Sequence, residues 1–403
     1  MTRMKVLVAD KFEKVGLDGL QALGCEVLSE PDLKDDALGA RIKESGAQVL
    51  VVRSTKVTAP MLEGSNLGLI IRAGAGVNTI DVAAASACGI QVANCPGKNS
   101  QAVAELAFGL ILAVDRKIPD NVIDTRNALW NKKTYSKARG IHGRTLGLIG
   151  MGKIGQEMVI RAKAFGMNVV CFSRWMTPEV AATLGIGRAS SIEELAAMSD
   201  IVSVHVSLTP ETKGILGASF FAAMQDGAYF INTSRGEVCD EAALRAELDK
   251  GRIFAGLDVF EGEPSGGDGL LDAPMVKQKN AYVTHHIGAS TDQAQDAIAR
   301  ETVRIVKEFK GTGKAPNTVN VSASGVVKTL LVVRHLDKVG VLAHVLSVLR
   351  DEGVNVQEME NIVLGGAHAA IAQIGLDKEI SAAALSKVKM NPHILDASQS
   401  SPE

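Results

Sequence analysis

Thr145-Leu-Gly-Leu-Ile-Gly-Met-Gly-Lys-Ile-Gly155 is the stretch that decides the fold, because it passes from an apolar strand through a Gly-x-Gly-x-x-Gly turn into a helix. The pattern is typical of a dinucleotide-binding βαβ unit. Gly150 allows the tight turn, Gly152 lets the backbone approach a pyrophosphate, and Gly155 lets the helix pack closely on its strand. A second strand, expected at Met167–Phe172, completes the unit. An ordinary glycine-rich turn is the alternative, and this context argues against it.

The end of that second strand indicates which dinucleotide is bound. NAD sites place Asp or Glu about 20 residues beyond the glycine motif, where it binds the ribose 2′-hydroxyl. This chain has Ser173 and Arg174 there instead. Arg174 can bind a 2′-phosphate through its guanidinium, and Ser173 can donate a hydrogen bond to it through its hydroxyl. The sequence therefore predicts NAD(H) or NADP(H) as cofactor and favours NADP(H). The alternative is an Arg174 that stacks on the adenine or points into solvent.

Composition narrows the class of protein. With 403 residues, two or three domains are expected, and 46% hydrophobic but only 4% aromatic residues is typical of an aliphatic-rich α/β protein. The net charge of -2 and the lack of a basic run argue against nucleic acid or a membrane surface as partner. The five cysteines are scattered and odd in number, which favours reduced thiols and a cytoplasmic location. No signal peptide and no bilayer-spanning segment are expected.

Short apolar strands that alternate with amphipathic helices organise the chain into three units. We expect a substrate-binding domain of residues 1–98 and 292–318 and a nucleotide-binding domain of residues 99–291. After a linker at 319–325, residues 326–397 predict a small βαββαβ module. The expected fold class is α/β, with two Rossmann-like parallel-sheet domains, the first flavodoxin-like, and this C-terminal module. The tail from Ser398 to Glu403 is expected to be disordered.

Three polar residues follow predicted strands of the nucleotide-binding unit, at the edge where open parallel sheets form their sites. They are Arg235 in Asn-Thr-Ser-Arg-Gly, Glu263 in Phe-Glu-Gly-Glu-Pro and His286 in Thr-His-His-Ile-Gly. Reduction of a 2-oxo acid needs a cation, a proton donor that works near neutral pH, and a hydride from nicotinamide. Arg235 and His286 match the first two needs, and Glu263 would keep the imidazolium available. Each has a structural alternative: an ion pair of Arg235 with Asp240, a turn cap by Glu263, and a buried, hydrogen-bonded His286.

These residues resemble the catalytic set of the D-2-hydroxyacid dehydrogenases, and the likeness extends over essentially the whole chain. Within the family it is strongest to the D-3-phosphoglycerate dehydrogenases, which implies oxidation of D-3-phosphoglycerate to 3-phosphohydroxypyruvate, the first step of serine synthesis. The resemblance makes Arg235, Glu263 and His286 catalytic. It implies cofactor contacts at Gly150, Met151, Gly152, Lys153, Ile154, Gly155, Ser173, Arg174, His205, Val206, Thr233, Asp258 and Gly288. Asp258 would bind the nicotinamide carboxamide; a buried, hydrogen-bonded strand residue is the alternative.

A phosphorylated substrate requires several cationic donors that converge. The segment that begins at Arg72 resembles the family's substrate-side glycine loop, whose amides, with those near Ser54, would hold the substrate carboxylate. The expected substrate residues are Arg53, Ser54, Arg72, Gly74, Gly76, Val77 and Lys132. Lys132 lies in a segment that reaches the neighbouring subunit's site in relatives, which implies a homodimer or homotetramer. A solvated surface lysine is the alternative.

Two departures from the family pattern keep other functions open. Ser173 replaces the usual acidic residue, and His285 stands where proline commonly precedes the catalytic histidine. Relatives that reduce glyoxylate or hydroxypyruvate with NADPH carry similar Ser-Arg sequences, so such a reductase is the alternative enzyme. A dinucleotide-sensing scaffold, similar to the transcriptional corepressors of this fold, is an alternative of another class. Turnover of a 2-oxo acid would distinguish the enzymes from the scaffold.

The C-terminal module resembles an ACT domain, a fold that commonly binds amino acids between subunits. His335, Asp337 and Asn355 match the positions that hold serine in regulated relatives, which implies a serine effector. The family's Asp-x-Pro-Gly is here Asp337-Lys-Val-Gly340, so Val339 replaces the proline. The next helix would still offer free amides to a carboxylate. The alternative is a module that only dimerises, with Asp337 as a helix cap. No metal site is predicted.

Overall fold

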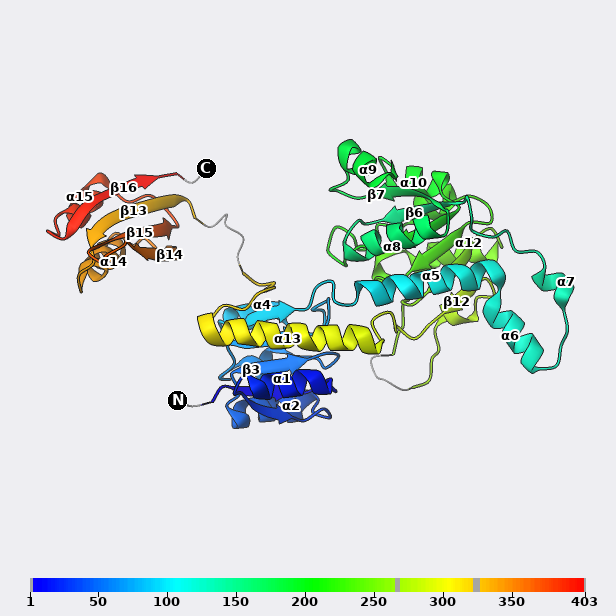
Figure 1. Cartoon of the computed structure of the whole chain (residues 1–403), viewed down its shortest axis with the longest axis horizontal. Helices are drawn as coiled ribbons and strands as arrows, with labels where there is room; N and C mark the ends of the chain where they lie inside the picture. Colours follow the sequence, from blue (N-terminus) through cyan, green and yellow to red (C-terminus); the bar gives the residue numbers. More distant parts are fainter. Residues whose placement is uncertain (1–2, 265–268, 322–326, 402–403) are drawn as a thin grey trace. The chain divides into compact units, whose positions relative to one another are not determined.

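The computed structural model describes residues 3–264, 269–321 and 327–401 (Figure 1). Contacts divide the chain into two compact units, Met1–Asn320 and Val321–Glu403. The first unit contains two parallel sheets, and the second contains one antiparallel sheet. The predicted α/β fold class is therefore confirmed, while the predicted boundaries within the first unit remain predictions. Within the described ranges, no helix combines the length and the apolar character needed to cross a bilayer.

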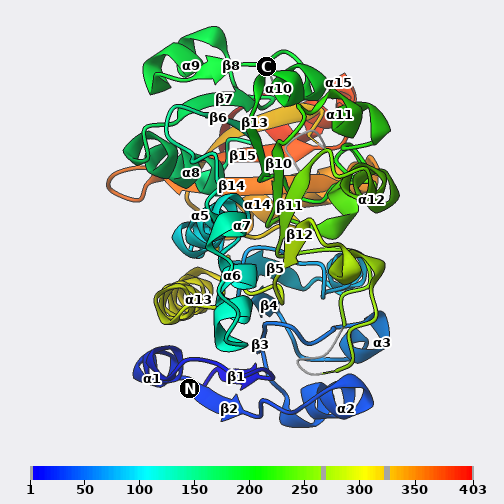
Figure 2. The same ribbon diagram turned by 90° about the vertical axis from the view of Figure 1, so that its right-hand side faces the viewer.

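Short apolar strands at the start of the chain form the first sheet. Its order is β2 (Glu26–Ser29), β1 (Lys5–Val8), β3 (Val49–Val52), β4 (Leu69–Arg72) and β5 (Gln91–Asn94), all parallel. One face packs against α1 (Lys14–Ala22) and α13 (Asp292–Thr312), and the other against α2 (Asp35–Ser45), α3 (Ala59–Leu62) and α4 (Val82–Ala87) (Figure 2). Because α13 lies so late in the sequence, the chain must return to this sheet after building the second one.

The second sheet has seven parallel strands. Their order is β12 (Ala281–Val283), β11 (Phe254–Leu257), β10 (Tyr229–Asn232), β9 (Ile201–Val204), β6 (Thr145–Ile149), β7 (Asn168–Phe172) and β8 (Gly187–Arg188). One face packs against α5 (Ser100–Arg116), α8 (Lys153–Ala164) and α9 (Pro178–Leu184), and the other against α10 (Ile192–Met198), α11 (Ala218–Ala223) and α12 (Glu241–Asp249). The strand order reverses between β6 and β9, and ligands of such sheets bind at this switch point, outside the carboxyl ends of the strands.

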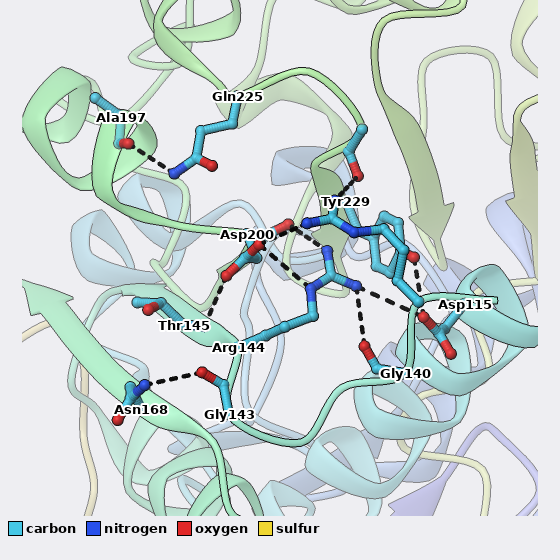
Figure 3. A network of polar contacts seen from close by, with 12 residues as sticks. Asp115, Gly140, Gly143, Arg144, Thr145, Asn168, Ala197, Asp200, Gln225 and Tyr229 are labelled. Atoms are coloured by element: carbon cyan, nitrogen blue, oxygen red, sulfur yellow. Dashed lines mark hydrogen bonds and ion pairs between the residues drawn. The ribbon is translucent and has the colours of Figure 1, made fainter.

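An arm of two helices, α6 (Ile118–Arg126) and α7 (Lys132–Tyr135), lies between α5 and β6. A buried polar network closes the base of this arm (Figure 3). The Arg144 side chain lies 3.5 Å from Asp115 and 3.4 Å from Asp200, and its guanidinium stacks 4.4 Å above the Tyr229 ring. The Tyr229 hydroxyl donates to Asp115 at 3.0 Å. The network thus joins the end of α5 to the amino ends of β6, β9 and β10.

The second unit is a βαββαβ fold. Its elements are β13 (Thr329–Leu336), α14 (Val341–Asp351), β14 (Val356–Val363), β15 (Ala369–Leu376), α15 (Ala382–Lys389) and β16 (Ile394–Ser400). The antiparallel sheet has the order β14-β15-β13-β16, and the apolar sides of both helices pack on it.

The expectation of a disordered tail from Ser398 is wrong as far as Ser400. These residues belong to β16, and Ser400 pairs with Leu330 of β13. The Gln399 side chain also bonds the backbone N and O of Ile380. Backbone pairing therefore holds the end of this strand, whose polar residues gave no sign of it in the sequence. Residues 402–403 lie outside the described part of the chain.

The predicted linker at 319–325 begins with two residues that hydrogen-bond along the edge strand of the first sheet, β5. Val319 N donates to Val92 O at 2.8 Å, and the Asn320 side chain bonds Val92 N and Ile90 O. Residues 322–325 of this predicted linker lie outside the described residues. Hydrogen bonds therefore hold the chain to the first unit as far as Asn320.

Candidate active site

The glycine motif forms a tight turn with one open side. Gly150 has φ 100°, and a Cβ there would lie 2.6 Å from the His205 carbonyl oxygen. A Cβ on Gly155 would lie 2.4 Å from the Gly150 oxygen, whereas one on Gly152 would meet no atom within 4 Å. Helix α8 starts at Lys153 without a side-chain cap, so its first amides are free to bind an anion. These residues fit a dinucleotide pyrophosphate.

The residues after β7 lie beside this turn, because Gly150 N donates to Phe172 O at 2.9 Å. Ser173 and Met176 close a turn through a 3.0 Å hydrogen bond. Arg174 is exposed, and its guanidinium lies 5.9 Å from the ring centroid of Trp175, whose exposed fraction is 81%. Sequence reasoning missed Trp175, although its place directly after a strand end was a usable signal. The turn presents a cation and an indole where the adenosine end of a dinucleotide is expected.

Two other predicted cofactor residues are buried and have polar atoms without a partner. Among the described residues, nothing hydrogen-bonds His205 Nδ1 or Thr233 Oγ1. His205 Nε2 lies 2.9 Å from Ser203 Oγ, and burial lowers the pKa of His205 to about 3, so its ring is neutral. Buried polar atoms are usually paired in proteins. These unpaired atoms fit hydrogen-bonding partners on a bound dinucleotide.

Arg235, Glu263 and His286 line one pocket of about 670 Å³. They lie on the segments that follow β10, β11 and β12, at the carboxyl ends of the strands. Glu263 Oε2 lies 2.7 Å from His286 Nδ1, and Glu263 Oε1 accepts from Phe260 N at 3.0 Å. Arg235 Nη1 donates to Ser234 O at 2.6 Å. The structure thus brings the three predicted catalytic residues together.

The contacts of this pocket determine the chemical state of Glu263. Burial alone would raise the pKa of Glu263, but hydrogen bonds from His286 and Phe260 and the charge of Arg235 hold it below its ordinary 4.5. The ionised carboxylate orients the His286 ring through Nδ1 and leaves Nε2 for a substrate. Glu263 does cap a turn through Phe260 N, as its structural alternative describes, but the alternatives for Arg235 and His286 do not match their contacts. Asp240 caps α12 by accepting from Ala243 N, and 45% of the His286 side chain is exposed.

Asp258 holds the loop that carries His286. Its carboxylate is 1% exposed and accepts from Thr284 Oγ1 at 2.6 Å, Ile287 N at 2.9 Å and Gly288 N at 2.8 Å. His286 has φ 53°, a backbone conformation that costs energy for a non-glycine residue and persists only where its surroundings enforce it. These contacts match the alternative of a buried, hydrogen-bonded Asp258. The contact with the nicotinamide carboxamide stays a prediction.

The substrate-side glycine loop makes room for two guanidinium groups. A Cβ on Gly74 would lie 1.7 Å from Arg72 Nη1, and one on Gly76 would lie 2.7 Å from Arg235 Nη2. Arg72 Nε donates to Arg53 O at 3.0 Å. Burial, together with the charges of Arg235 and Arg53, lowers the pKa of Arg72 to about 10. Three arginines therefore converge from the loop after β3, the end of β4 and the loop after β10. Val77 follows in the same loop and packs on the first sheet.

The amides near Ser54 do not face a substrate, so that part of the predicted carboxylate site is wrong. The backbone N atoms of Arg53, Ser54 and Thr55 donate to Asp10 Oδ2 at 2.7, 3.2 and 3.1 Å. The reason is a partner more than 40 residues away, which no local pattern reveals. Asp10 was missed, although a carboxylate directly after the first apolar strand was a usable signal.

Lys132 lies apart from the pocket, as the first residue of α7 on the exposed arm. The arm also exposes large apolar side chains: Ile118, Val122, Ile123, Leu129 and Trp130.

The predicted effector residues do not meet within one chain. His335 is 2% exposed, and its ring nitrogens lie 2.8 Å from Leu336 O and 3.1 Å from Asn361 Oδ1. Asp337 directly follows the last residue of β13, and Asn355 directly precedes the first residue of β14. The first residues of β13 and β14 both pair with Leu376 of β15, so these two strands begin at the same end of the sheet. Asn355 is therefore at the opposite end of the sheet from His335 and Asp337. A shared site would need a second copy of the chain.

A glycine turn that fits a dinucleotide, together with a pocket that contains an arginine, a glutamate and a histidine, is typical of the nucleotide-dependent dehydrogenases. Residues 108–288 match the family model described as D-isomer specific 2-hydroxyacid dehydrogenase, NAD binding domain. The chain is 41% identical over 314 residues to hydroxypyruvate reductase of Thermotoga maritima, covering 77% of this chain and 99% of that protein. The chain belongs to the D-isomer specific 2-hydroxyacid dehydrogenase family.

Other relatives extend the comparison. D-3-phosphoglycerate dehydrogenase of Methanocaldococcus jannaschii is 40% identical over 320 residues, which are 79% of this chain but 59% of that protein. The chain thus spans less than two thirds of that relative. An NADPH-dependent glyoxylate/hydroxypyruvate reductase from Sinorhizobium meliloti, solved with NADP and malonate, has a TM-score of 0.67 and 27% identity, covering 79% of this chain and 97% of that one. Either nicotinamide dinucleotide is consistent with these likenesses.

Proposed function

We propose that the chain catalyses reversible hydride transfer between D-3-phosphoglycerate and 3-phosphohydroxypyruvate, the first step of serine synthesis. The observation that carries the proposal is the convergence of Arg53, Arg72 and Arg235, of which Arg235 lines the same pocket as Glu263 and His286. A substrate with both a carboxylate and a phosphate requires more than one cationic donor. A smaller 2-oxo acid with one carboxylate needs fewer cationic donors.

The roles of the residues follow from their contacts. Arg235 binds the substrate carboxylate and carbonyl oxygen. His286 Nε2 donates the proton during reduction and takes it during oxidation, because Nδ1 is held by Glu263. Glu263 stabilises the imidazolium by its charge. When bound, the nicotinamide supplies the hydride for reduction or accepts it for oxidation. Asp258 keeps the His286 loop in its strained conformation.

The cofactor preference that we propose is NADP(H). No carboxylate stands at Ser173 or Arg174 to repel a 2′-phosphate, and the Arg174 guanidinium is exposed beside the glycine turn. Arginine at this point is the known means of accommodating the 2′-phosphate.

Assembly and regulation are further parts of the proposal. The apolar side chains of the arm support a homodimer or homotetramer in which Lys132 reaches a neighbouring site. A serine effector would bind where two C-terminal units bring Asn355 of one copy to His335 and Asp337 of another. A cytoplasmic location fits the five cysteines, all of which are unpaired.

Steady-state reduction of 3-phosphohydroxypyruvate, hydroxypyruvate and glyoxylate, each with NADH and NADPH, tests the proposal. We expect the highest kcat/KM with the phosphorylated substrate and with NADPH. Equal or better turnover of glyoxylate would assign the chain to the reductases, which the relative from Thermotoga maritima also represents. Absence of turnover with all three would favour the dinucleotide-sensing scaffold.

A further inference from the structure

The Asp10 carboxylate gathers five hydrogen bonds from one loop. Besides the three amides that donate to Oδ2, the hydroxyls of Ser54 and Thr55 each donate to Oδ1 at 3.0 Å. Asp10 lies just beyond β1, and β1 pairs with β3, which leads into the loop. The first sheet therefore places this carboxylate beside the loop from Arg53 to Thr55. No step of the proposed reaction uses Asp10.

Three successive amides that converge on one point form the kind of concavity that binds an anion. Here an internal carboxylate occupies it. Burial alone would raise the pKa of Asp10, but the amides of Arg53 and Thr55 and the two hydroxyls hold it below its ordinary 3.8. Asp10 is therefore ionised at neutral pH. The loop amides are used to fix the loop, which leaves the guanidinium groups to bind the substrate.

The position of this loop is transmitted to the arginines. Arg53 O accepts from Arg72 Nε, so the backbone that Asp10 fixes also orients the Arg72 guanidinium. Arg72 lies near two like charges, those of Arg53 and Arg235. Mutually repelling cations separate unless contacts hold them, since like charges in a partly buried site are unfavourable. The contact of Arg72 with Arg53 O counteracts this separation.

We propose that Asp10 is a positioning residue for anion recognition, which fixes the Arg53–Thr55 loop so that Arg53 and Arg72 are pre-arranged for the substrate phosphate. This inference rests on the proposed function, because it assigns the phosphate to those two arginines. It predicts that Asp10 governs the binding of the phosphorylated substrate and leaves proton and hydride transfer unchanged.

The test compares Asp10→Ala and Asp10→Asn in the full-length protein. We expect Asp10→Ala to raise KM for 3-phosphohydroxypyruvate about tenfold, as for a lost charge-assisted interaction, and to change kcat and cofactor Kd by less than about twofold. Asp10→Asn should restore most of the affinity, because its amide oxygen can accept from the loop amides while its NH2 donates to the hydroxyls. Calorimetric titration with 3-phosphoglycerate should show the same order of affinities without turnover.

Glu30→Ala is the matched control. Glu30 also follows a strand of the first sheet, β2, and its carboxylate accepts three hydrogen bonds, but all come from Arg41. We expect this variant to keep the KM of the wild type. If Asp10→Ala does not fold, the double variant Ser54→Ala/Thr55→Val removes two of the five donors and should raise KM about threefold.

The outcomes separate this inference from the proposed function. A wild-type protein that prefers hydroxypyruvate to its phosphorylated form contradicts the proposed function, whatever the variants do. A wild type that prefers the phosphorylated substrate, with unchanged KM in the folded Asp10 variant, overturns the role of Asp10. A fall in kcat that equals the rise in KM also overturns it, because a merely structural defect acts on both.

Discussion

His286 shows how one residue of the site depends on two carboxylates with different tasks. Asp258 accepts from the amides of Ile287 and Gly288 and so holds the backbone at φ 53°, while Glu263 bonds the ring itself. Asp258 positions the imidazole through the backbone, whereas Glu263 orients the ring and acts on its protonation. Only Glu263 is therefore expected to affect how activity varies with pH.

Glu263→Gln tests this distinction. The folded pKa of Glu263 is below its ordinary 4.5, so its stabilising contacts are present above that pH and are lost as pH falls through the folded value. At neutral pH the wild-type carboxylate is charged and favours the imidazolium. Without that charge, kcat/KM for reduction should decline at a lower pH than in the wild type. The measurement is a pH profile of kcat/KM for reduction. Glu261→Gln, from the same pocket, is the control, and equal profiles for both variants would contradict the role of Glu263.

Single residues could be predicted from sequence where a local pattern placed them. Arg235, Glu263 and His286 each follow an apolar strand, and the carboxyl ends of parallel strands share one edge. Ser54 was misjudged because its amide is bonded to Asp10, 44 residues earlier in the chain. Sequence pattern locates a strand end, but it does not show which long-range partner already uses a given donor.

Among the elements, apolar strands were predictable and polar edge strands were not. The strand expected at Met167–Phe172 is observed at Asn168–Phe172, and its three central residues are buried. The predicted βαββαβ module implied the edge strand β16, but its polar end, Ser398–Ser400, was expected to be disordered, and only the pairing with β13 reveals it. The two-residue β8, whose residues are exposed at the other sheet's edge, was not predicted for the same reason. Pairing of edge strands depends on tertiary contacts that periodicity does not contain.

The elements around the arm depend on the network of Arg144 (Figure 3). Arg144→Met would leave Asp115, which is 6% exposed, without its cation, and removing one partner of a buried ion pair typically costs about 3 to 5 kcal/mol. We expect a loss of that size in the free energy of unfolding, measured by urea denaturation. Arg139→Met is the control, because Arg139 pairs with the same Asp200 at 3.2 Å but is 54% exposed, so its loss should cost less than about 1 kcal/mol. Equal losses for the two variants would show that burial does not determine how much each ion pair contributes to the free energy of unfolding.

At the scale of the whole molecule, packing predicts which parts fold on their own. Among the residues that the structure describes, each of the five core clusters draws on one unit, and that of the second unit consists of its own helices and strands. By contrast, α13 places Ile298, Ile305 and Val306 in the core of the first sheet. A chain that ends at Asn320 keeps this core, and one that ends at Thr291 loses it.

We therefore expect the chain ending at Asn320 to fold and to bind NADPH with the Kd of the full-length protein, because the glycine turn and the triad lie within the first unit. The chain ending at Thr291 should fail to fold, since three buried apolar side chains lost together cost about 5 kcal/mol or more. Circular dichroism and nucleotide titration measure both outcomes. If serine inhibits the full-length protein, the chain ending at Asn320 should be insensitive to it, because coupling requires both sites. Serine inhibition that survives the truncation would instead place the effector site within the first unit.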